Sequence, residues 1–469
     1  MSLNVDQIVE AVTRFPVLGT AVLSLFDAID SAISTVSEGQ LPLAEVETEI
    51  ENVCARMACG ALREVLVACE PSAKEVEVDG RRYRRMPESN RGIYFGLRGP
   101  MELRRHLYRE VGVHNGATVV PLERLAGIVA GRWTPLAAVA VAHLLQDEPS
   151  RDALETCKVL KVLPYSRCSL ERGGQQVGEA WENIREEAEE HLATSFEVPP
   201  NATSLAVSVD RVALPMEESR GTDAKGKEKI EVVYRMAYCG IWTLYDADGT
   251  ALHSTRYGRM PSEGHENLEE ALRGDVEALL RQRPNLRVLG LADGAPEMQF
   301  ILDRILQEVT QETSANIDFW HLVEKLAAAA TAAGRPTEWV QKFKSWLKEQ
   351  EDGAEQVEKE LQIWADAYEP WPVPEALETV QTYLARNRDR MRYKKLLDAG
   401  LPIGSGPVEA TCKTLVTTRM KRSGARWKPA GGQAVLSLRS LARSSRWEPA
   451  MKYLLASFEK PVRAVRITK

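Results

Sequence analysis

Cysteine and histidine are both scarce in this chain, with 7 of each among 469 residues. The cysteines are scattered and odd in number, which argues against a disulfide framework and favours a reducing compartment. Cys54 and Cys59 come closest to a metal-ligand pair. They fall in a helical pattern with no second pair, so we interpret them as buried thiols.

Long apolar runs are also lacking. No run approaches the roughly 20 residues of a membrane-spanning helix, and the N-terminus has no signal-peptide pattern. We therefore expect a cytoplasmic protein with no membrane partner. Hydrophobic residues make up 44% and charged residues 27%, which is typical of globular proteins. The chain is too long for one core, so several domains are expected.

Basic residues are concentrated near the C-terminus. The net charge is −7, yet residues 411–469 hold 14 Lys and Arg against two Glu. Such asymmetry favours a basic binding surface on this part of the chain. A solvated charged tail is the alternative, but Trp427, Trp447 and Tyr453 and the periodic Leu and Val residues indicate that the segment folds.

Composition and periodicity predict six segments. They are a helical region 1–74, a small β module 75–132, a helical region 133–199, the first part of an α/β core 200–334, a helical insertion 335–398, and the completion of the core 399–469. The arginine-rich β module either contacts DNA or presents a solvated sheet face. The helices from Ser150 and Ser166 resemble a helix-turn-helix, with plain helical packing as the alternative.

The α/β segment begins with three strands in a meander, at 204–215, 232–244 and 250–257, and its polar residues 217–230 are typical of a mobile hairpin tip or loop. A helix, a buried strand at 285–294, a helix, a short strand at 315–318 and a helix from Phe319 follow. This succession predicts a mixed five-stranded sheet of the RNase H-like kind. In that fold the first and fourth strands are neighbours.

Three carboxylates stand at chemically suggestive places in this pattern. Asp210 lies mid-strand among apolar residues, where an unpaired carboxylate is costly. Asp293 closes the fourth strand, at the sheet edge where ligands bind. Glu409 follows the turn Gly404-Ser405-Gly406 and lies near the start of a helix. An oxygen-only set suits two Mg²⁺ or Mn²⁺ ions, which can promote in-line displacement at phosphorus. The alternative for each residue is an ordinary turn or surface acid.

The residues around these acids resemble DDE-type insertion-sequence transposases of the ISKra kind. The matching stretches are Ser208–Val212, Leu289–Ala295, Ile317–Leu326, Leu401–Ala410 and Arg419–Trp427. The resemblance implies an RNase H-like catalytic domain that cuts and joins transposon ends with divalent metal. By motif position it implies that Asp210, Asp293 and Glu409 are catalytic. His321 matches an accessory position, or else makes a structural contact at a helix start.

The sequence departs from the family pattern at two places. Relatives often carry Cys-x-x-Cys in the N-terminal β module, whereas Tyr108–Leu122 contains no cysteine, so zinc is not expected there. Asp210 is followed by Arg211 where a small residue is common. Arg211 either contacts phosphate or points away across the sheet.

The basic segment supplies the DNA-binding candidates, which are Arg419, Lys421, Arg422, Arg426 and Trp427. Their cations would neutralise backbone phosphates, and Trp427 would stack on a base or else anchor the segment to the core. The expected partners are double-stranded DNA, as terminal inverted repeats and target, and further copies of the chain in a homodimer or larger assembly. A transposase-derived DNA-binding protein without transposition activity and a plain nuclease are the alternative functions.

Overall fold

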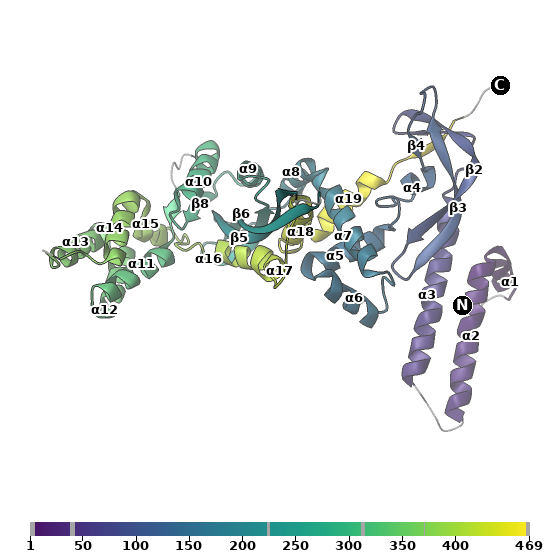
Figure 1. The fold of residues 1–469 in the computed structure, drawn as a ribbon, viewed down its shortest axis with the longest axis horizontal. Helices are drawn as coiled ribbons and strands as arrows, with labels where there is room; N and C mark the ends of the chain where they lie inside the picture. The colour runs from purple at the N-terminus through teal and green to yellow at the C-terminus, as the bar shows by residue number, and fades with distance from the viewer. Residues whose placement is uncertain (1–4, 38–42, 223–225, 311–314, 370, 466–469) are drawn as a thin grey trace. The chain divides into compact units, whose positions relative to one another are not determined.

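The computed structural model describes residues 5–37, 43–222, 226–310, 315–369 and 371–465. The chain forms two compact units, one of Met1–Asn183 with Met451–Lys469 and the other of Ile184–Ala450. Each unit contains one five-stranded sheet, and helices form most of the rest (Figure 1). The predicted mixed α/β class is therefore confirmed.

The first unit begins with three helices, α1 (Val5–Arg14), α2 (Pro16–Ser37) and α3 (Leu43–Ala68), as the sequence predicts. Helices α2 and α3 lie side by side (Figure 1). Helix α1 approaches α2 closely at Gly19, where a Cβ atom would lie 2.6 Å from Cγ1 of Val12. One expectation is wrong. Cys54 is exposed on α3 and Cys59 is only half-buried, because the helix turns these positions partly away from its packed side.

The sheet of the first unit has the order β10-β1-β2-β3-β4. Its strands are β1 (Glu75–Val78), β2 (Arg81–Phe95), β3 (Pro100–Glu110), β4 (Thr118–Val119) and β10 (Val462–Ala464). Asp79 and Gly80 form the hairpin turn between β1 and β2, with φ angles of 51° and 72°. The antiparallel ladder of β2 and β3 continues past an irregularity between Arg85 and Ser89.

Four helices follow in this unit, α4 (Pro121–Leu125), α5 (Pro135–Asp147), α6 (Ser150–Val159) and α7 (Arg167–Glu182). Helices α6 and α7 are the predicted pair. Gly173 and Gly174 on α7 allow close packing, because Cβ atoms there would lie 2.5 Å from the Trp133 ring and 2.6 Å from the Leu145 side chain. The face of α7 that carries these glycines therefore packs inside the unit. Binding of DNA by α6 and α7 stays a prediction.

The sheet of the second unit has the order β7-β6-β5-β8-β9. Its strands are β5 (Ser204–Thr222), β6 (Glu228–Tyr245), β7 (Ala251–Arg259), β8 (Arg287–Ala292) and β9 (Asn316–Ile317). Strands β5, β6 and β7 form an antiparallel meander, and β8 and β9 continue parallel from β5. Of the two alternatives for residues 217–230, a hairpin tip and a loop, the structure supports the hairpin, because the β5–β6 ladder reaches Thr222 and Glu228. Its central residues 223–225 lie outside the described part.

The helices of this unit pack on the sheet or on one another. They are α8 (Arg185–Ser195), α9 (Glu266–Gln282), α10 (Pro296–Val309), α11 (Phe319–Ala332), α12 (Glu338–Glu349), α13 (Gly353–Asp366), α14 (Glu375–Asn387), α15 (Tyr393–Asp398), α16 (Gly406–Thr411), α17 (Thr418–Met420) and α18 (Pro429–Ala442), with a 3-10 turn at Arg388–Arg390 and a π-helix at Cys412–Thr417. Helix α19 (Trp447–Phe458) follows at the boundary with the other unit.

Side-chain alternation divides the β5 residues between the two faces of the sheet, where they join three hydrophobic cores. Leu205, Val207 and Val209 join the core under α9 and α10. Ala206 joins the core with α11 to α15, while Leu214 joins the one with α18 and the π-helix. Asp210 is an even number of residues from both Ala206 and Leu214, so its side chain projects from the same face of the sheet as theirs. The predicted helical insertion is present as α12 to α15.

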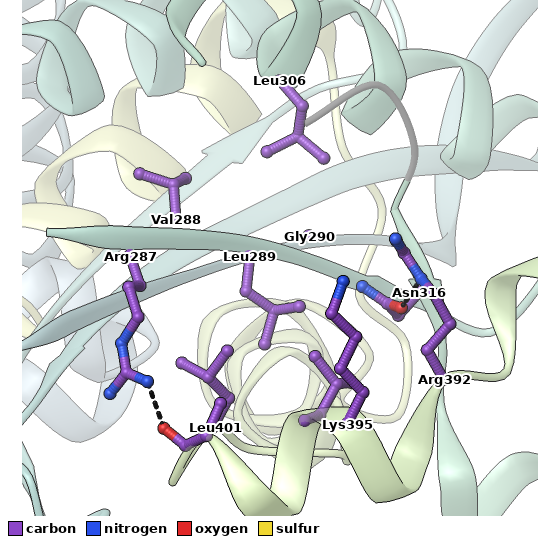
Figure 2. Close-up of a pocket in the computed structure, with 11 residues that line it drawn as sticks. Arg287, Val288, Leu289, Gly290, Leu306, Asn316, Arg392, Lys395 and Leu401 are labelled. Atoms are coloured by element: carbon purple, nitrogen blue, oxygen red, sulfur yellow. Dashed lines mark hydrogen bonds between the residues drawn. The ribbon is translucent and has the colours of Figure 1, made fainter. Parts of the chain in front are cut away.

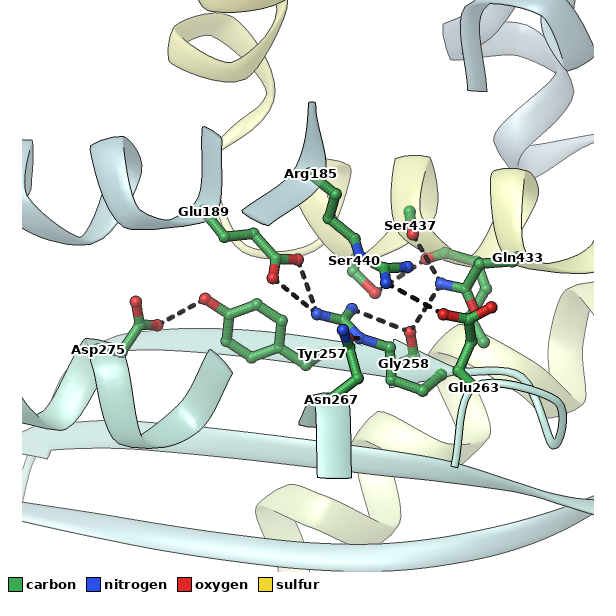
Figure 3. Close-up of polar contacts among 12 residues, drawn as sticks. Arg185, Glu189, Tyr257, Gly258, Glu263, Asn267, Asp275, Gln433, Ser437 and Ser440 are labelled. Carbon is green, nitrogen blue, oxygen red and sulfur yellow. Dashed lines mark hydrogen bonds and ion pairs between the residues drawn. The ribbon is translucent and has the colours of Figure 1, made fainter. Parts of the chain in front are cut away.

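A buried polar network fixes α8 and α18 to strand β7 (Figure 3). Arg259 is 0% exposed, and its Nη2 lies 2.8 and 2.7 Å from the two carboxylate oxygens of Glu189 on α8. Gln433 on α18 accepts the backbone N–H of Met260 at 2.8 Å and donates to the Gly258 carbonyl. Because each buried charge has its partner, this network orders the C-terminal helices on the sheet.

Candidate active site

Asp210 lies in the middle of β5, directly opposite Cys239 on β6. Its Oδ1 accepts the backbone N–H of Arg211 at 2.7 Å, and its Oδ2 accepts the Cys412 thiol at 3.5 Å. Burial raises the pKa of the Asp210 carboxyl, and the negative charge of Asp293 acts in the same direction, while the Arg211 N–H and the thiol oppose it. Asp210 is thus a half-buried carboxylate whose charge is only partly compensated.

Asp293 directly follows β8 and projects from the end of that parallel strand. Its Oδ1 accepts the Ala295 N–H at 2.9 Å, forming a turn through Gly294, whose φ is +87°. The Tyr383 hydroxyl on α14 donates to the Asp293 carbonyl oxygen at 2.7 Å. The turn therefore uses one carboxylate oxygen of Asp293, Oδ1, and does not use Oδ2.

Glu409 lies in the first turn of α16, as predicted, with Pro407 at the helix start. Helix α16 packs on β5 and β6. Partial burial raises the pKa of the Glu409 carboxyl, as do the charges of Asp318, Asp210 and Glu324, while His321 lowers it. Helix α16 runs on into the π-helix, an irregular form that is frequent at functional sites.

Asp210 lies close enough to both Asp293 and Glu409 for their charges to interact. The charge of Asp293 raises the pKa of Asp210, and the charge of Asp210 raises the pKa of Glu409. Within the described ranges, no group of three or more His, Cys, Asp or Glu side chains is close enough to hold a metal ion. Carboxylate oxygens are ligands that suit a hard divalent cation, so the three acids would have to move closer together to hold one.

Asp318 is the site residue that the motif search did not single out. It is 1% exposed and caps α11 by accepting the His321 N–H at 2.6 Å. Its second oxygen accepts the Ser405 N–H, and its own N–H donates to the Ala292 carbonyl at 2.8 Å. Asp318 therefore joins the end of β8 to the turn that precedes Glu409. An Asp before an apolar helical run was the available sequence signal.

His321 lies in the first turn of α11, within electrostatic reach of Glu409. Its ring centroid is 6.5 Å from that of Tyr383. Arg211 is engaged at the other side of the site, where it forms an ion pair with Glu297 on α10. The Tyr238 hydroxyl donates to the same Glu297 carboxylate at 2.7 Å. Arg211 thus pairs with a side chain that the sequence did not identify.

The basic segment divides into exposed and buried cations. Lys421, Arg422 and Arg426 are exposed, whereas Arg419 is buried. Arg439 and Arg446, which also contributed to the charge count, are buried within the protein. Local charge counted along the sequence therefore overestimates the cations available to a polyanion.

Trp427 has the contacts of an anchor. Its indole N–H donates to the Met420 carbonyl at 2.8 Å, and its backbone pairs with Pro215 and Glu217 of β5. The Arg419 guanidinium lies over the ring at 5.2 Å from its centroid. The half-buried ring packs against the core around Leu415. These contacts agree with the anchoring alternative, and base stacking stays a prediction.

We expect Trp427→Ala to lower the stability of the second unit by about 2–4 kcal/mol, because a half-buried indole and its hydrogen bond are removed. Trp427→Phe should cost less, since the ring packing is kept. Thermal unfolding of both variants measures the difference. Equal stability of Trp427→Ala and the unchanged protein would show that the ring does not anchor the segment.

A separate cavity of about 250 Å³ lies beside β8 and α15 (Figure 2). Its walls include Leu289 and Leu306, and its rim carries Arg287, Arg392 and Lys395. Arg287 donates to the Ala399 carbonyl and Arg392 to the Asn316 side chain. The cavity is lined along β8 from Arg287 to Gly290, and Asp210, Asp293 and Glu409 are not among its lining residues. It is distinct from the carboxylate site.

Comparisons with known proteins find no match to any family model, to any curated protein or to any solved structure.

Proposed function

We propose that the second unit is an RNase H-like catalytic domain and that the chain is a DDE-type DNA transposase. The observation that supports this proposal best is that Asp210, in the middle of β5, lies close enough to Asp293 at the end of β8 and to Glu409 on α16 for their charges to interact. Strand order β7-β6-β5-β8-β9, with the first three antiparallel and the last two parallel to β5, supports this fold. Asp210, Asp293 and Glu409 occupy the positions that the family resemblance implies.

In the proposed metal-bound protein, Asp210, Asp293 and Glu409 would draw closer together than they lie in this structure and would hold two Mg²⁺ or Mn²⁺ ions through their carboxylate oxygens. When bound, the ions supply activation of the attacking hydroxyl and stabilisation of the leaving oxygen at phosphorus. The Arg211 N–H and the Cys412 thiol orient the Asp210 carboxylate. Asp318 fixes the turn before Glu409 and so sets the place where the third acid enters.

The substrate of this site would be double-stranded DNA, both the terminal inverted repeats of an element and the target. Phosphate oxygens of the nucleic acid would fill further coordination positions of the ions, so three protein carboxylates suffice as ligands. Pairing two ends requires at least two copies of the chain. The protein would act in the cytoplasm, on the nucleoid.

The proposal is tested by incubating the purified full-length protein with DNA that carries the terminal repeats, in Mg²⁺ or Mn²⁺. Metal-dependent nicking and joined products are expected, and both should vanish in Asp293→Asn and Glu409→Gln. The matched control is Asp248→Asn, which changes an exposed turn acid of the same unit and should retain activity. Nicking without joined products would indicate a plain nuclease. Tight binding without any cleavage would indicate a transposase-derived DNA-binding protein.

We expect the combined replacement of Lys421, Arg422 and Arg426 by Ala to weaken DNA binding on all sequences alike. Each phosphate that the protein no longer neutralises reduces the slope of log affinity against log salt by about 0.9, so the slope should fall by about 2–3. Fluorescence anisotropy with a labelled duplex at several salt concentrations measures the slope. Replacing exposed Lys359 and Arg386 instead should leave it unchanged. An unchanged slope in the triple variant would contradict the assignment of this DNA-binding surface.

A further inference from the structure

Helix α2 carries two apolar seams, and only one of them is covered. The first seam consists of Ala21, Leu25, Ala28 and Ala32, which are buried or half-buried. These positions follow alternating spacings of four and three residues, the pattern of helices that pack in coiled coils. The corresponding residues of helix α3 have the same spacing and are also at least half-buried; they are Val46, Ile50, Val53, Met57 and Gly60.

The second seam lies one residue further along, at Val22, Phe26, Ile29 and Ile33. It repeats the spacing of four, three and four residues. Val22 is half-buried, and the other side chains are open to solvent, with Phe26 57% and Ile33 60% exposed. Leu23 beside it is 59% exposed. The sequence pattern predicts a buried stripe here, whereas the described residues of the chain leave most of it uncovered.

The spacing identifies what can cover this seam. A strip with the 3.5-residue repeat accepts the knobs of another helix with the same repeat. In a two-fold dimer one strip covers its own copy, because the same patch serves both subunits. Asp27 and Asp30 are the two charged residues in the 22 residues of α2, and neither belongs to the seam. A second copy of α2 therefore offers a continuous apolar partner.

A membrane is the competing occupant. Residues Leu18–Thr35 are long and apolar enough to cross one, with a mean hydropathy of 1.2. Two observations disfavour it. Asp27 and Asp30 would lie near the centre of the span, where a carboxylate is costly. Helix α2 also packs along α3, whose charged residues include Glu47, Glu49 and Arg56, and these would have to enter the bilayer with it.

We propose that the seam Val22-Phe26-Ile29-Ile33 of α2 is a self-association surface, on which α2 of a second copy of this chain docks to form a helical bundle with both α3 helices. This inference does not depend on the proposed function, and substitutions of the catalytic acids should leave it intact.

The test is sedimentation velocity of the full-length protein without DNA over a range of concentrations. We expect a dimer or larger assembly, and we expect the double variant Phe26→Glu with Ile33→Glu to sediment as a monomer, with its dissociation constant raised at least 100-fold. Ser31→Glu is the control, because this exposed residue of α2 lies on the side of the helix opposite the seam. It should assemble like the unchanged protein.

Circular dichroism at 222 nm keeps the result interpretable, since equal helicity of the three proteins shows that the variants fold. A monomeric unchanged protein would overturn the proposal, as would a double variant that folds and still assembles. Flotation with vesicles of phosphatidylcholine and phosphatidylglycerol tests whether a membrane, instead of a second copy of the chain, covers the seam. Binding of the unchanged protein, abolished in the double variant, would assign the seam to a membrane surface and overturn the proposal.

Discussion

Asp210→Asn is expected to abolish metal-dependent DNA cleavage while raising the melting temperature of the metal-free protein. The loss of activity should be on the order of 10³-fold or more, because the residue is the acid that interacts with both others. The gain in stability has a separate cause. The folded protein holds this carboxylate in a half-buried place beside Asp293, and Asn keeps the shape and the acceptor for the Arg211 N–H without the charge.

The pH dependence follows from the direction of the shifts. The pKa values of Asp210 and Glu409 are raised in the folded state. Protonation of these groups therefore favours folding, and this contribution is lost as pH rises through their raised pKa values. Above the raised pKa values both groups are ionised and cost stability without metal. Below the raised pKa values the protons compete with metal, so activity should fall on acidification.

Differential scanning fluorimetry with and without Mn²⁺ measures both effects. The unchanged protein should gain melting temperature with Mn²⁺, because a ligand that binds the folded state stabilises it. Asp210→Asn should start higher and gain little. Asp248→Asn, in an exposed turn, should behave like the unchanged protein. A variant that still responds fully to Mn²⁺ would remove Asp210 from the ligand set.

The three candidate acids could be selected from the sequence because their positions are defined by local pattern. Asp210 interrupts a strand, Asp293 closes one, and Glu409 follows a Gly-rich turn and Pro407. Each is visible without tertiary information. The strand neighbours were predicted from the order of elements. The same logic was less precise at 217–230, where a polar composition allowed either a hairpin tip or a loop, although the ladder continues to Thr222 and Glu228. Composition does not report pairing between two exposed strands.

Other features depend on partners far away in the chain. The role of Asp318 comes from Ser405 and Ala292, which are 87 and 26 residues away. The basic C-terminal residues looked equivalent in the sequence, yet Arg446 is buried against Asp275 and Tyr257. A charged residue is buried only where the fold places a partner beside it, and the periodicity of the sequence does not show where that happens. Similarly, the stripe at Phe26 predicted burial without showing what would cover it.

Asp275→Ala is expected to destabilise the second unit by about 3–5 kcal/mol, the cost typical of a buried ion pair from which one partner is removed. Oδ2 of Asp275 accepts the Tyr257 hydroxyl at 2.7 Å and the Arg446 guanidinium at 3.1 Å, and it also accepts the Trp242 indole N–H. Asp275 and Arg446 are 2% and 5% exposed. Removal of the carboxylate leaves the guanidinium buried beside the neutral hydroxyl of Tyr257 and over the rings of Trp242 and Tyr257, without the carboxylate that it contacts.

The magnitude is checked by urea unfolding of Asp275→Ala against a matched substitution at the surface. Glu231→Ala removes the carboxylate of an exposed ion pair with Arg220, in the same unit, and should cost at most about 1 kcal/mol. The double variant Asp275→Leu with Arg446→Leu should recover part of the stability, because apolar side chains replace both charges together. If the double variant were less stable than Asp275→Ala, the cost would lie in the packing around Trp242. If instead the double variant recovers stability, the cost of Asp275→Ala lies in the unpaired charge of Arg446. The ion pair then holds α9 and the segment after α18 in place on the sheet.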